Sequence, residues 1–161
     1  SIRKQSDVSN NEDLLPGFLK TCTLGYDGKG QFFLKNKEEA SELKIEFDKE
    51  HILEKKVNLK KEISVVITRF LNNDFVTYEP IENLHINQML SRSTIPADID
   101  KVISEKAKQY ARLIAEKLDY IGTMCVEYFI DKENNLLVNE IAPRVHNSGH
   151  LTKLRQLHRK R

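Results

Sequence analysis

The sequence has 161 residues, of which 39% are hydrophobic and 31% are charged. This apolar share is enough to build the core of one domain, or of part of a larger protein, and it excludes a wholly disordered chain. The 26 basic residues nearly balance the 24 acidic ones, which gives a formal net charge of +2. The charge balance therefore favours neither a nucleic-acid nor a membrane partner, and we expect small-molecule ligands.

The beginning of the chain and its cysteines bear on its cellular setting. Residues 1–15 are polar without a usable periodicity, and we interpret them as a lead-in. Because the first residue is Ser1 and not Met, we interpret the chain as a processed product. Neither a secretory leader nor a membrane-length apolar stretch is found, so we expect a cytoplasmic protein. Cys22 and Cys125 stand alone in the sequence, and we interpret both as buried thiols.

The first half of the chain predicts a series of short strands. Residues 18–23 and 31–34 have strand character and flank the run Gly25-Tyr26-Asp27-Gly28-Lys29-Gly30, which predicts a hairpin. Residues 37–50 are helix-prone. Further strands are predicted at residues 51–57, 62–70 and 75–78.

The second half predicts a covering helix and a second hairpin. The helix opens at Pro96-Ala97-Asp98, and six apolar residues fall near one of its faces: Ile99, Val102, Ile103, Tyr110, Ile114 and Leu118. Strands at 123–131 and 136–141 follow, joined by Lys132-Glu133-Asn134-Asn135, and a polar loop covers residues 142–150. The pattern indicates an α+β fold with a mainly antiparallel sheet and covering helices.

The second hairpin contains a candidate metal site. If the turn is symmetric about Glu133 and Asn134, then Glu127 faces Glu140, Cys125 faces Ala142 and Phe129 faces Val138. Two opposed carboxylates in an apolar stripe repel each other, and a divalent cation would convert this repulsion into coordination. Asn139 offers another oxygen. The alternative is a hairpin at a sheet edge with both acids in water, and a three-residue turn would break this register.

The glycine run is a candidate phosphate loop, although it matches neither the P-loop nor the dinucleotide-binding pattern. Successive backbone NH groups could hold phosphate, assisted by Lys20 and Lys29. The alternative is that these glycines only supply positive φ angles to a turn. Glu54 and Glu62 bracket Val57, where a strand end could meet an adenine and Glu62 a ribose; either acid could also be a surface residue.

Several motifs together resemble one family. The run Phe18-Leu-Lys20-Thr-Cys-Thr-Leu-Gly25-Tyr-Asp-Gly-Lys-Gly30-Gln31 is similar to the phosphate-loop hairpin of the ATP-grasp enzyme 5-(carboxyamino)imidazole ribonucleotide synthase. Further similarities follow in the expected order: Glu62-Ile-Ser-Val, Arg69, Glu82-Asn83-Leu84-His85, Pro96-Ala97 and Asn139-Glu140-Ile-Ala-Pro-Arg144-Val-His146-Asn147-Ser148-Gly149-His150. The last run is the most specific.

The resemblance implies a partial ATP-grasp domain over residues 16–152, with a basic tail at 153–161. The family has a substrate domain before the glycine loop and a small domain after the histidine loop, and we expect this chain to lack both. The tail could contact a polyanion or simply be solvated. The implied reaction is de novo purine synthesis chemistry: ATP and bicarbonate form carboxyphosphate, whose carbon dioxide unit is captured by 5-aminoimidazole ribonucleotide. The full-length family implies a homodimer.

The resemblance also implies residue roles. Mg²⁺ or Mn²⁺ would be held by Glu127, Glu140 and Asn139, and catalytic contacts would come from Asp27, Lys29 and Arg144. The ATP contacts implied are Lys20, Gly25, Gly28, Gly30, Gln31, Glu54, Val57 and Glu62. The substrate contacts implied are Tyr26, Arg69, His85, His146, Asn147 and Ser148.

Three alternatives remain open at this point. The chain could be a non-catalytic or degenerate Mg-ATP-binding fragment. It could be another ATP-grasp ligase, such as the formate-dependent glycinamide ribonucleotide transformylase, although Asn147-Ser148-Gly149-His150 argues against it. Single residues could also be structural: Arg69 could pair with Glu62 or Glu82, and the loop histidines could simply be hydrogen-bonded.

Overall fold

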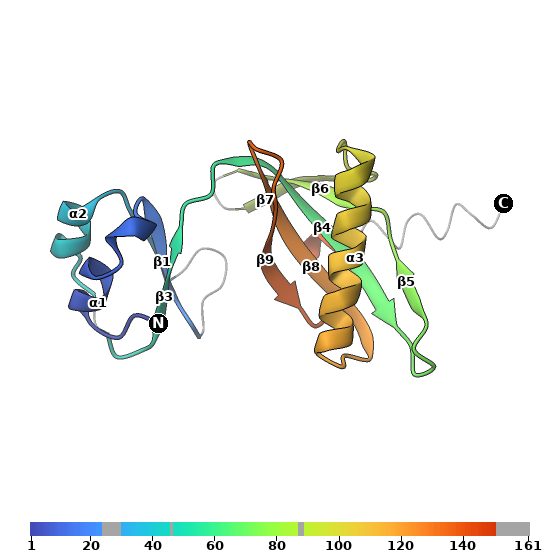
Figure 1. Cartoon of the computed structure of the whole chain (residues 1–161), viewed down its shortest axis with the longest axis horizontal. Helices are drawn as coiled ribbons and strands as arrows, with labels where there is room; N and C mark the ends of the chain where they lie inside the picture. The colour runs from blue at the N-terminus through green and yellow to red at the C-terminus, as the bar shows by residue number, and fades with distance from the viewer. Residues whose placement is uncertain (24–29, 46, 87–88, 151–161) are drawn as a thin grey trace. The chain divides into compact units, whose positions relative to one another are not determined.

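The computed structural model describes residues 1–23, 30–45, 47–86 and 89–150, without the side chains of Gln5, Ser148 and His150 (Figure 1). The chain divides into two compact units, residues 1–57 and residues 58 onward, and each is described by itself. No helix among the described residues is long and apolar enough to cross a membrane.

The first unit is built on a three-stranded antiparallel sheet in the order β2-β1-β3. Its strands are β1 (Gly17–Thr21), β2 (Gln31–Leu34) and β3 (His51–Lys55). The predicted hairpin is confirmed, with Lys20 opposite Gln31, while its tip at residues 24–29 lies outside the described residues. Gly30 closes it with a φ of 75°, and a Cβ there would lie 2.7 Å from Thr21 Oγ1, so only glycine fits.

The helices of this unit correct two expectations. Residues 1–15 are not a loose lead-in, because α1 (Gln5–Ser9) and η1 (Glu12–Leu14) form there and Ile2 and Val8 are buried in the core. Ile2 and Val8 are six residues apart and gave no periodicity from which to predict this. The helix expected over 37–50 is α2 (Lys37–Glu42), which ends early because Leu43, Ile45 and Phe47 continue in extended or irregular backbone against the core.

The second unit is a six-stranded sheet in which every pairing is antiparallel, in the order β7-β6-β4-β8-β9 with β5 also on β4. The mainly antiparallel α+β fold is therefore confirmed. The strands are β4 (Leu59–Arg69), β5 (Phe75–Thr77), β6 (Ile81–Ile86), β7 (Met89–Thr94), β8 (Gly122–Asp131) and β9 (Leu136–Ala142). β6 and β7 were not expected from the sequence.

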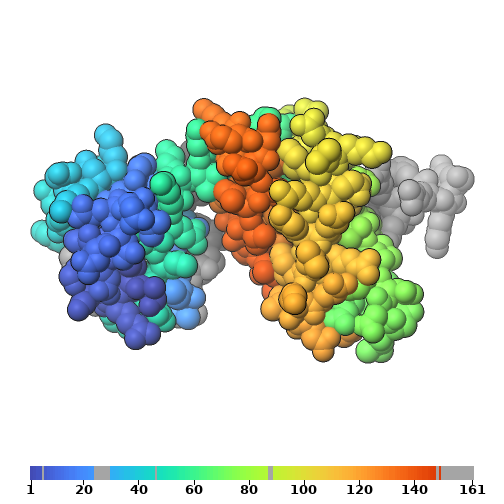
Figure 2. All heavy atoms as spheres, viewed as in Figure 1, coloured from blue at the N-terminus to red at the C-terminus, as the bar shows by residue number. Residues whose placement is uncertain are grey.

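Helix α3 (Lys101–Lys117) covers one face of this sheet, beside β8 and β9 in the space-filling view (Figure 2). Three buried alanines, Ala107, Ala111 and Ala115, pack on apolar residues of β4 and β8, together with the partly buried Ile103, Tyr110 and Ile114. Tyr128 on β8 donates a hydrogen bond to the carbonyl of Ala107 at 3.0 Å. Burial raises the pKa of Tyr128, so this hydroxyl stays a donor.

The predicted start and face of α3 were partly wrong. The helix begins after Asp100, because the preceding amides are bonded elsewhere: Ala97 to the carbonyl of Pro80 at 2.8 Å and Asp98 to Glu82 at 3.2 Å. Val102 is 78% exposed. Ile99, Ile103, Tyr110 and Ile114 pack against the core as predicted, whereas Val102 and Leu118 are exposed. The three alanines were not predicted to lie on this face.

The opposite face of the sheet carries a small apolar cluster of Val66, Ile81, Cys125 and Ala142, over which η2 (Asn147–His150) folds back. A Cβ on Gly149 would lie 2.9 Å from Val66 Cγ2, so glycine permits this close approach. Cys125 is buried as predicted, but the prediction for Cys22 was wrong, because its side chain is exposed.

The alanine contact gives a stability prediction. Ala111→Leu should lower the free energy of unfolding by about 1–3 kcal/mol, because the added atoms have no room between α3 and the sheet. Val102→Leu adds a methylene at an exposed position of the same helix and should stay within about 0.5 kcal/mol of the parent chain. Urea unfolding measures both, and equal stability of the two variants would contradict this packing.

Candidate metal centre

The ladder between β8 and β9 places Glu127 directly opposite Glu140, as predicted. The turn and the register that lead to this pairing differ from the prediction. The turn has three residues, with Asp131 and Asn135 bonded at 3.1 Å and Asn134 at a φ of 64°, so Phe129 faces Leu137 and not Val138. A bulge then inserts one extra residue, Asn139, and restores the expected register at the two carboxylates.

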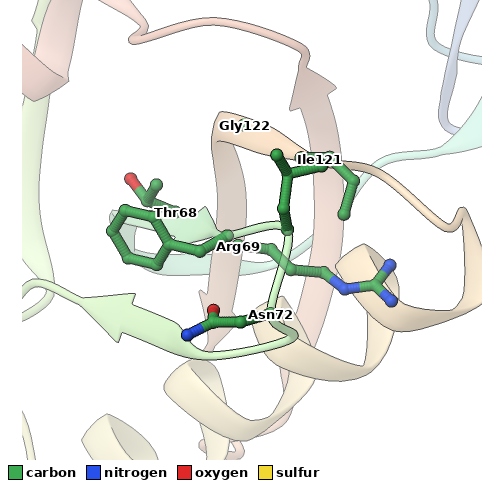
Figure 3. Close-up of a pocket in the computed structure, with 7 residues that line it drawn as sticks. Thr68, Arg69, Asn72, Ile121 and Gly122 are labelled. Atoms are coloured by element: carbon green, nitrogen blue, oxygen red, sulfur yellow. The ribbon is translucent and has the colours of Figure 1, made fainter.

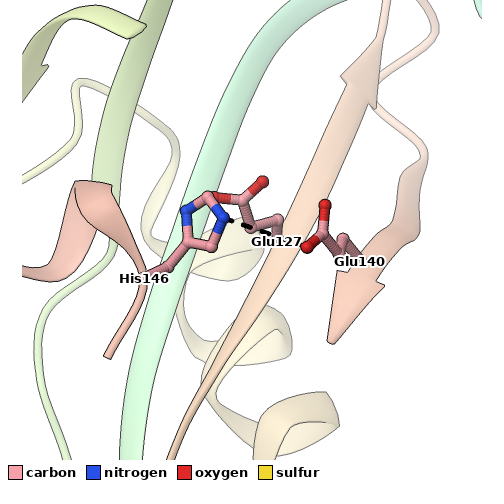
Figure 4. Close-up of side chains that lie close together, drawn as sticks. All are labelled: Glu127, Glu140 and His146. Atoms are coloured by element: carbon pink, nitrogen blue, oxygen red, sulfur yellow. Dashed lines mark ion pairs between the residues drawn. The ribbon is translucent and has the colours of Figure 1, made fainter. Parts of the chain in front are cut away.

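A histidine completes a cluster with the two acids (Figure 4). One ligand atom from each of Glu127, Glu140 and His146 can be chosen so that all lie within 4.8 Å of one another. His146 Nδ1 is 2.8 Å from Glu127 Oε1, and its Nε2 is 3.9 Å from Glu140 Oε1. The side chain of Glu127 is 12% exposed and that of Glu140 is 56% exposed. The cluster is therefore buried on the β8 side and open to solvent on the β9 side.

The charges of this cluster are partly compensated. Glu127 raises the pKa of His146 above its ordinary value, and Glu140 adds to this, against the opposing effect of burial. The Nδ1 contact is an ion pair without the alignment of a hydrogen bond. A protonated His146 offsets one of the two negative charges that the ladder brings together.

The donor set fits a divalent cation that prefers oxygen. Glu127 and Glu140 supply two carboxylates, which is the number Mg²⁺ takes from a protein when water and phosphate fill its other positions. Asn139 is the bulged residue next to Glu140 and is exposed. The imidazole of His146 would suit a metal such as Zn²⁺ or Fe²⁺ better than Mg²⁺ or Mn²⁺, which prefer oxygen.

A second pair of candidate residues lies on the same face. Glu62 on β4 and His85 on β6 form an ion pair, with Oε2 and Nδ1 2.5 Å apart. Glu62 is two residues from Ser64, the residue that faces Glu127 across the ladder, so its side chain projects from the same side of the sheet. The structure thus brings Glu62, His85, Glu127, Glu140 and His146 to one face of the second unit.

The first unit carries its own group of candidate residues. Lys20 Nζ and Glu54 Oε2 are 2.5 Å apart on neighbouring strands, and Gln31 is opposite Lys20 on the other side. Val57 is the last residue of this unit. The residues predicted at the tip of the glycine loop, Gly25, Tyr26, Asp27, Gly28 and Lys29, lie outside the described residues, as does the side chain of Ser148.

Arg69 is not brought to this site. It is bonded to Asp119 at 2.8 Å and to Asn73 at 2.6 Å, so the suggested pairing with Glu62 or Glu82 was wrong. Arg69 lines an open pocket with Thr68, Asn72, Ile121 and Gly122 at one end of β4 (Figure 3). Five residues of strand, about 16 Å, separate it from the position opposite Glu127.

The histidine loop, residues 142–150, is described except for the side chains of Ser148 and His150. Arg144 and Asn147 are exposed, and an Arg144 guanidinium nitrogen donates to the carbonyl of Val145 at 3.3 Å. The family resemblance implied that His146 contacts the substrate. It did not predict that His146 lies beside both glutamates. Strand-pairing arithmetic stops at Ala142, so it could not position a loop residue.

Comparison with known proteins identifies the family of this chain. A model of the ATP-grasp domain matches residues 4–157. The chain belongs to the ATP-grasp family. The domain model begins within the segment expected to be a lead-in, in agreement with the core residues found there.

Two relatives with the same name share more than two-fifths of their aligned residues with this chain. The chain is 45% identical over 141 residues to N5-carboxyaminoimidazole ribonucleotide synthase of Bacillus subtilis (strain 168), covering 86% of this chain and 37% of the relative. It is 44% identical over 154 residues to that of Staphylococcus aureus (strain MRSA252), covering 93% and 40%. The ATP-grasp chain therefore spans about two-fifths of the length of these relatives.

Solved structures of proteins with this name have a similar fold. N5-carboxyaminoimidazole synthetase from Staphylococcus aureus complexed with ADP superposes with a TM-score of 0.84 at 39% identity, covering 96% of this chain and 42% of that one. The synthetase from Thermus thermophilus gives 0.83 at 34% identity, covering 94% and 41%. The resemblance found in the sequence is confirmed.

The His146 ion pair predicts a pH dependence of stability. The folded-state pKa of His146 is raised, so the stabilisation is fully present below the unfolded-state pKa and is lost as pH rises through the folded-state pKa. Unfolding of the metal-free chain in chelator should therefore show stability falling across this window. Glu127→Gln should flatten that fall, and an NMR-measured His146 pKa at or below its ordinary value would contradict the ion pair.

Proposed function

We propose that this chain is the ATP-binding part of an N5-carboxyaminoimidazole ribonucleotide synthase, which carboxylates 5-aminoimidazole ribonucleotide with ATP and bicarbonate. The observation that supports this most is the opposed pair of Glu127 and Glu140 on the open face of an ATP-grasp sheet. Relatives at 44–45% identity carry that name. The cytoplasmic location and the homodimer expected from the resemblance belong to this proposal.

ATP binding follows from the same likeness. The Staphylococcus aureus structure is named as a complex with ADP, and a structure from Aspergillus clavatus, 25% identical with a TM-score of 0.78, is named as a complex with ATP. In this chain Lys20 and the amides of the glycine loop would bind phosphate, and Glu62 would accept hydrogen bonds from ribose hydroxyls. Glu54, Val57 and Gln31 complete the proposed nucleotide contacts.

The metal would bind to Glu127 and Glu140, with Asn139 beside them. When bound, a divalent ion supplies charge compensation for the transferring phosphoryl group. Glu127, fixed in the sheet, would set the position, while the exposed Glu140 can adjust. His146 exchanges its ion pair with Glu127 for contacts to the anionic substrates.

The remaining roles concern the two substrates. Arg144 offers a guanidinium fork to bicarbonate or to the ribonucleotide phosphate. His146, Asn147 and Ser148 lie in the loop that folds over the sheet, and with Tyr26, Asp27 and Lys29 of the glycine loop they would hold 5-aminoimidazole ribonucleotide. Clamping both anions in place is how such a site would accelerate transfer without a covalent nucleophile.

The metal role has a direct test. Glu140→Gln should weaken magnesium-dependent ADP binding by at least the roughly 10- to 100-fold typical of perturbed metal sites, because it removes the charge of the open ligand. Glu133→Gln is the matched control, since it makes the same change at the exposed tip of the same hairpin and should leave binding unchanged. Calorimetric titration measures both, and unaltered binding by Glu140→Gln would refute the metal role.

The substrate assignment needs a separate test. In the natural full-length protein, ADP release should require both bicarbonate and 5-aminoimidazole ribonucleotide. ADP release supported by formate and glycinamide ribonucleotide would instead identify a formate-dependent glycinamide ribonucleotide transformylase. Nucleotide binding without release under either condition would indicate a non-catalytic module.

A further inference from the structure

A row of polar side chains crosses the sheet on the face that carries the two glutamates. Ser93 on β7 donates a hydrogen bond to Asn83 Oδ1 on β6 at 2.9 Å. Asn83 Nδ2 in turn donates to Ser64 Oγ on β4 at 3.1 Å. Asn83 is 6% exposed and Ser64 is fully buried.

The row leads to the metal centre. Ser64 is the direct cross-strand partner of Glu127 on β8. Such partners have Cβ atoms about 5 Å apart, within reach of a serine hydroxyl and a glutamate carboxylate. Each step therefore moves one strand closer to Glu127, from β7 to β6, then β4, then β8.

The hydrogen bonds from Ser93 to Asn83 and from Asn83 to Ser64 both donate towards β8. Because Ser64 Oγ accepts from Asn83, the hydroxyl hydrogen of Ser64 points to a different partner. The carboxylate of Glu127 is the charged acceptor directly across the ladder. Hydrogen bonds that all donate in one direction strengthen one another, most of all when they end on an anion.

Stability alone does not favour such a row. It is next to the apolar cluster of Val66, Ile81, Cys125 and Ala142, where aliphatic side chains would avoid the desolvation cost of four polar groups. η2 contacts β4, β6 and β7 on this part of the sheet, and Ser64 and Asn83 are shielded from water there. A shielded row that ends opposite a metal ligand has the layout of the outer-sphere partners that orient such ligands.

We propose that Ser64, held by Asn83 and Ser93, is a positioning residue that fixes the carboxylate of Glu127 for the divalent cation. His146 contacts the same carboxylate at 2.8 Å. Ser64 then retains the carboxylate when His146 turns to substrate. This inference rests on the proposed metal site and adds residues that do not touch the metal themselves.

The test compares hydroxyl deletions on the same sheet. Ser64→Ala removes the last donor of the row, and Ser93→Ala removes the first. Thr68→Val is the matched control, because Thr68 Oγ1 and Thr123 Oγ1 are 2.8 Å apart on β4 and β8, four residues along from Ser64. Mn²⁺ binding is titrated by electron paramagnetic resonance with saturating ADP, and melting temperatures are recorded in parallel.

Ser64→Ala should weaken Mn²⁺ binding by about 10- to 100-fold, the range found for outer-sphere partners of metal ligands. Ser93→Ala should weaken it less but measurably, and Thr68→Val should bind as the parent does. A purely structural row would lower the melting temperature of Ser64→Ala and Thr68→Val alike while leaving Mn²⁺ affinity unchanged, which would overturn the inference.

The two proposals fail in different ways. If the parent chain binds no Mn²⁺ with ADP, the metal site itself is refuted. If the parent binds and Glu140→Gln does not, but Ser64→Ala and Ser93→Ala both match the parent, the site stands and the positioning role is refuted. Should Ser64→Ala not fold, the affinity of Ser93→Ala alone decides, because Ser93 lies on the outer strand β7.

Discussion

The pairing of Glu127 with Glu140 across β8 and β9 is the constraint on which the rest of this site depends. Strand pairing fixes two like charges side by side, which is unfavourable unless a cation is shared between them. His146 lies beside both carboxylates and, when protonated, offsets part of this charge. The repulsion that would make this a poor structural pair makes it a good cation site, because binding relieves it.

The two faces of the sheet of the second unit carry different kinds of side chain. One face is covered by α3 and carries the larger apolar cluster of this unit. The other carries, among the described residues, a smaller apolar cluster together with the carboxylates, the Glu62–His85 pair and the row from Ser93 to Ser64. Rigid packing on the first face allows polar groups on the second to be held in place. Arg69, bonded to Asp119, belongs to the end of the sheet away from the carboxylates.

Much of the fold and site could be predicted from the sequence, because strand pairing and turn signals are local. The glycine hairpin, the opposition of Glu127 and Glu140 and the family resemblance all follow from short runs of residues. The opposition was predicted correctly from a symmetric turn that does not exist: the three-residue turn shifts the register by one, and the bulge at Asn139 shifts it back. The pairing of Phe129 was predicted wrongly because the turn has three residues. The bulge could not be predicted either, because bulges leave little trace in a single sequence. The position of His146, the partner of Arg69 and the exposure of Cys22 depend on tertiary packing.

The central claim is that a divalent cation binds between Glu127 and Glu140 when nucleotide is present. Paramagnetic broadening of backbone NMR signals by substoichiometric Mn²⁺ with ADP tests this without any substitution. Broadening should centre on the amides of Glu127, Glu140 and His146 and should spare Arg69 and Gly122, since line broadening falls steeply with distance from the ion. Broadening centred elsewhere, or equal at both ends of β8, would contradict the account.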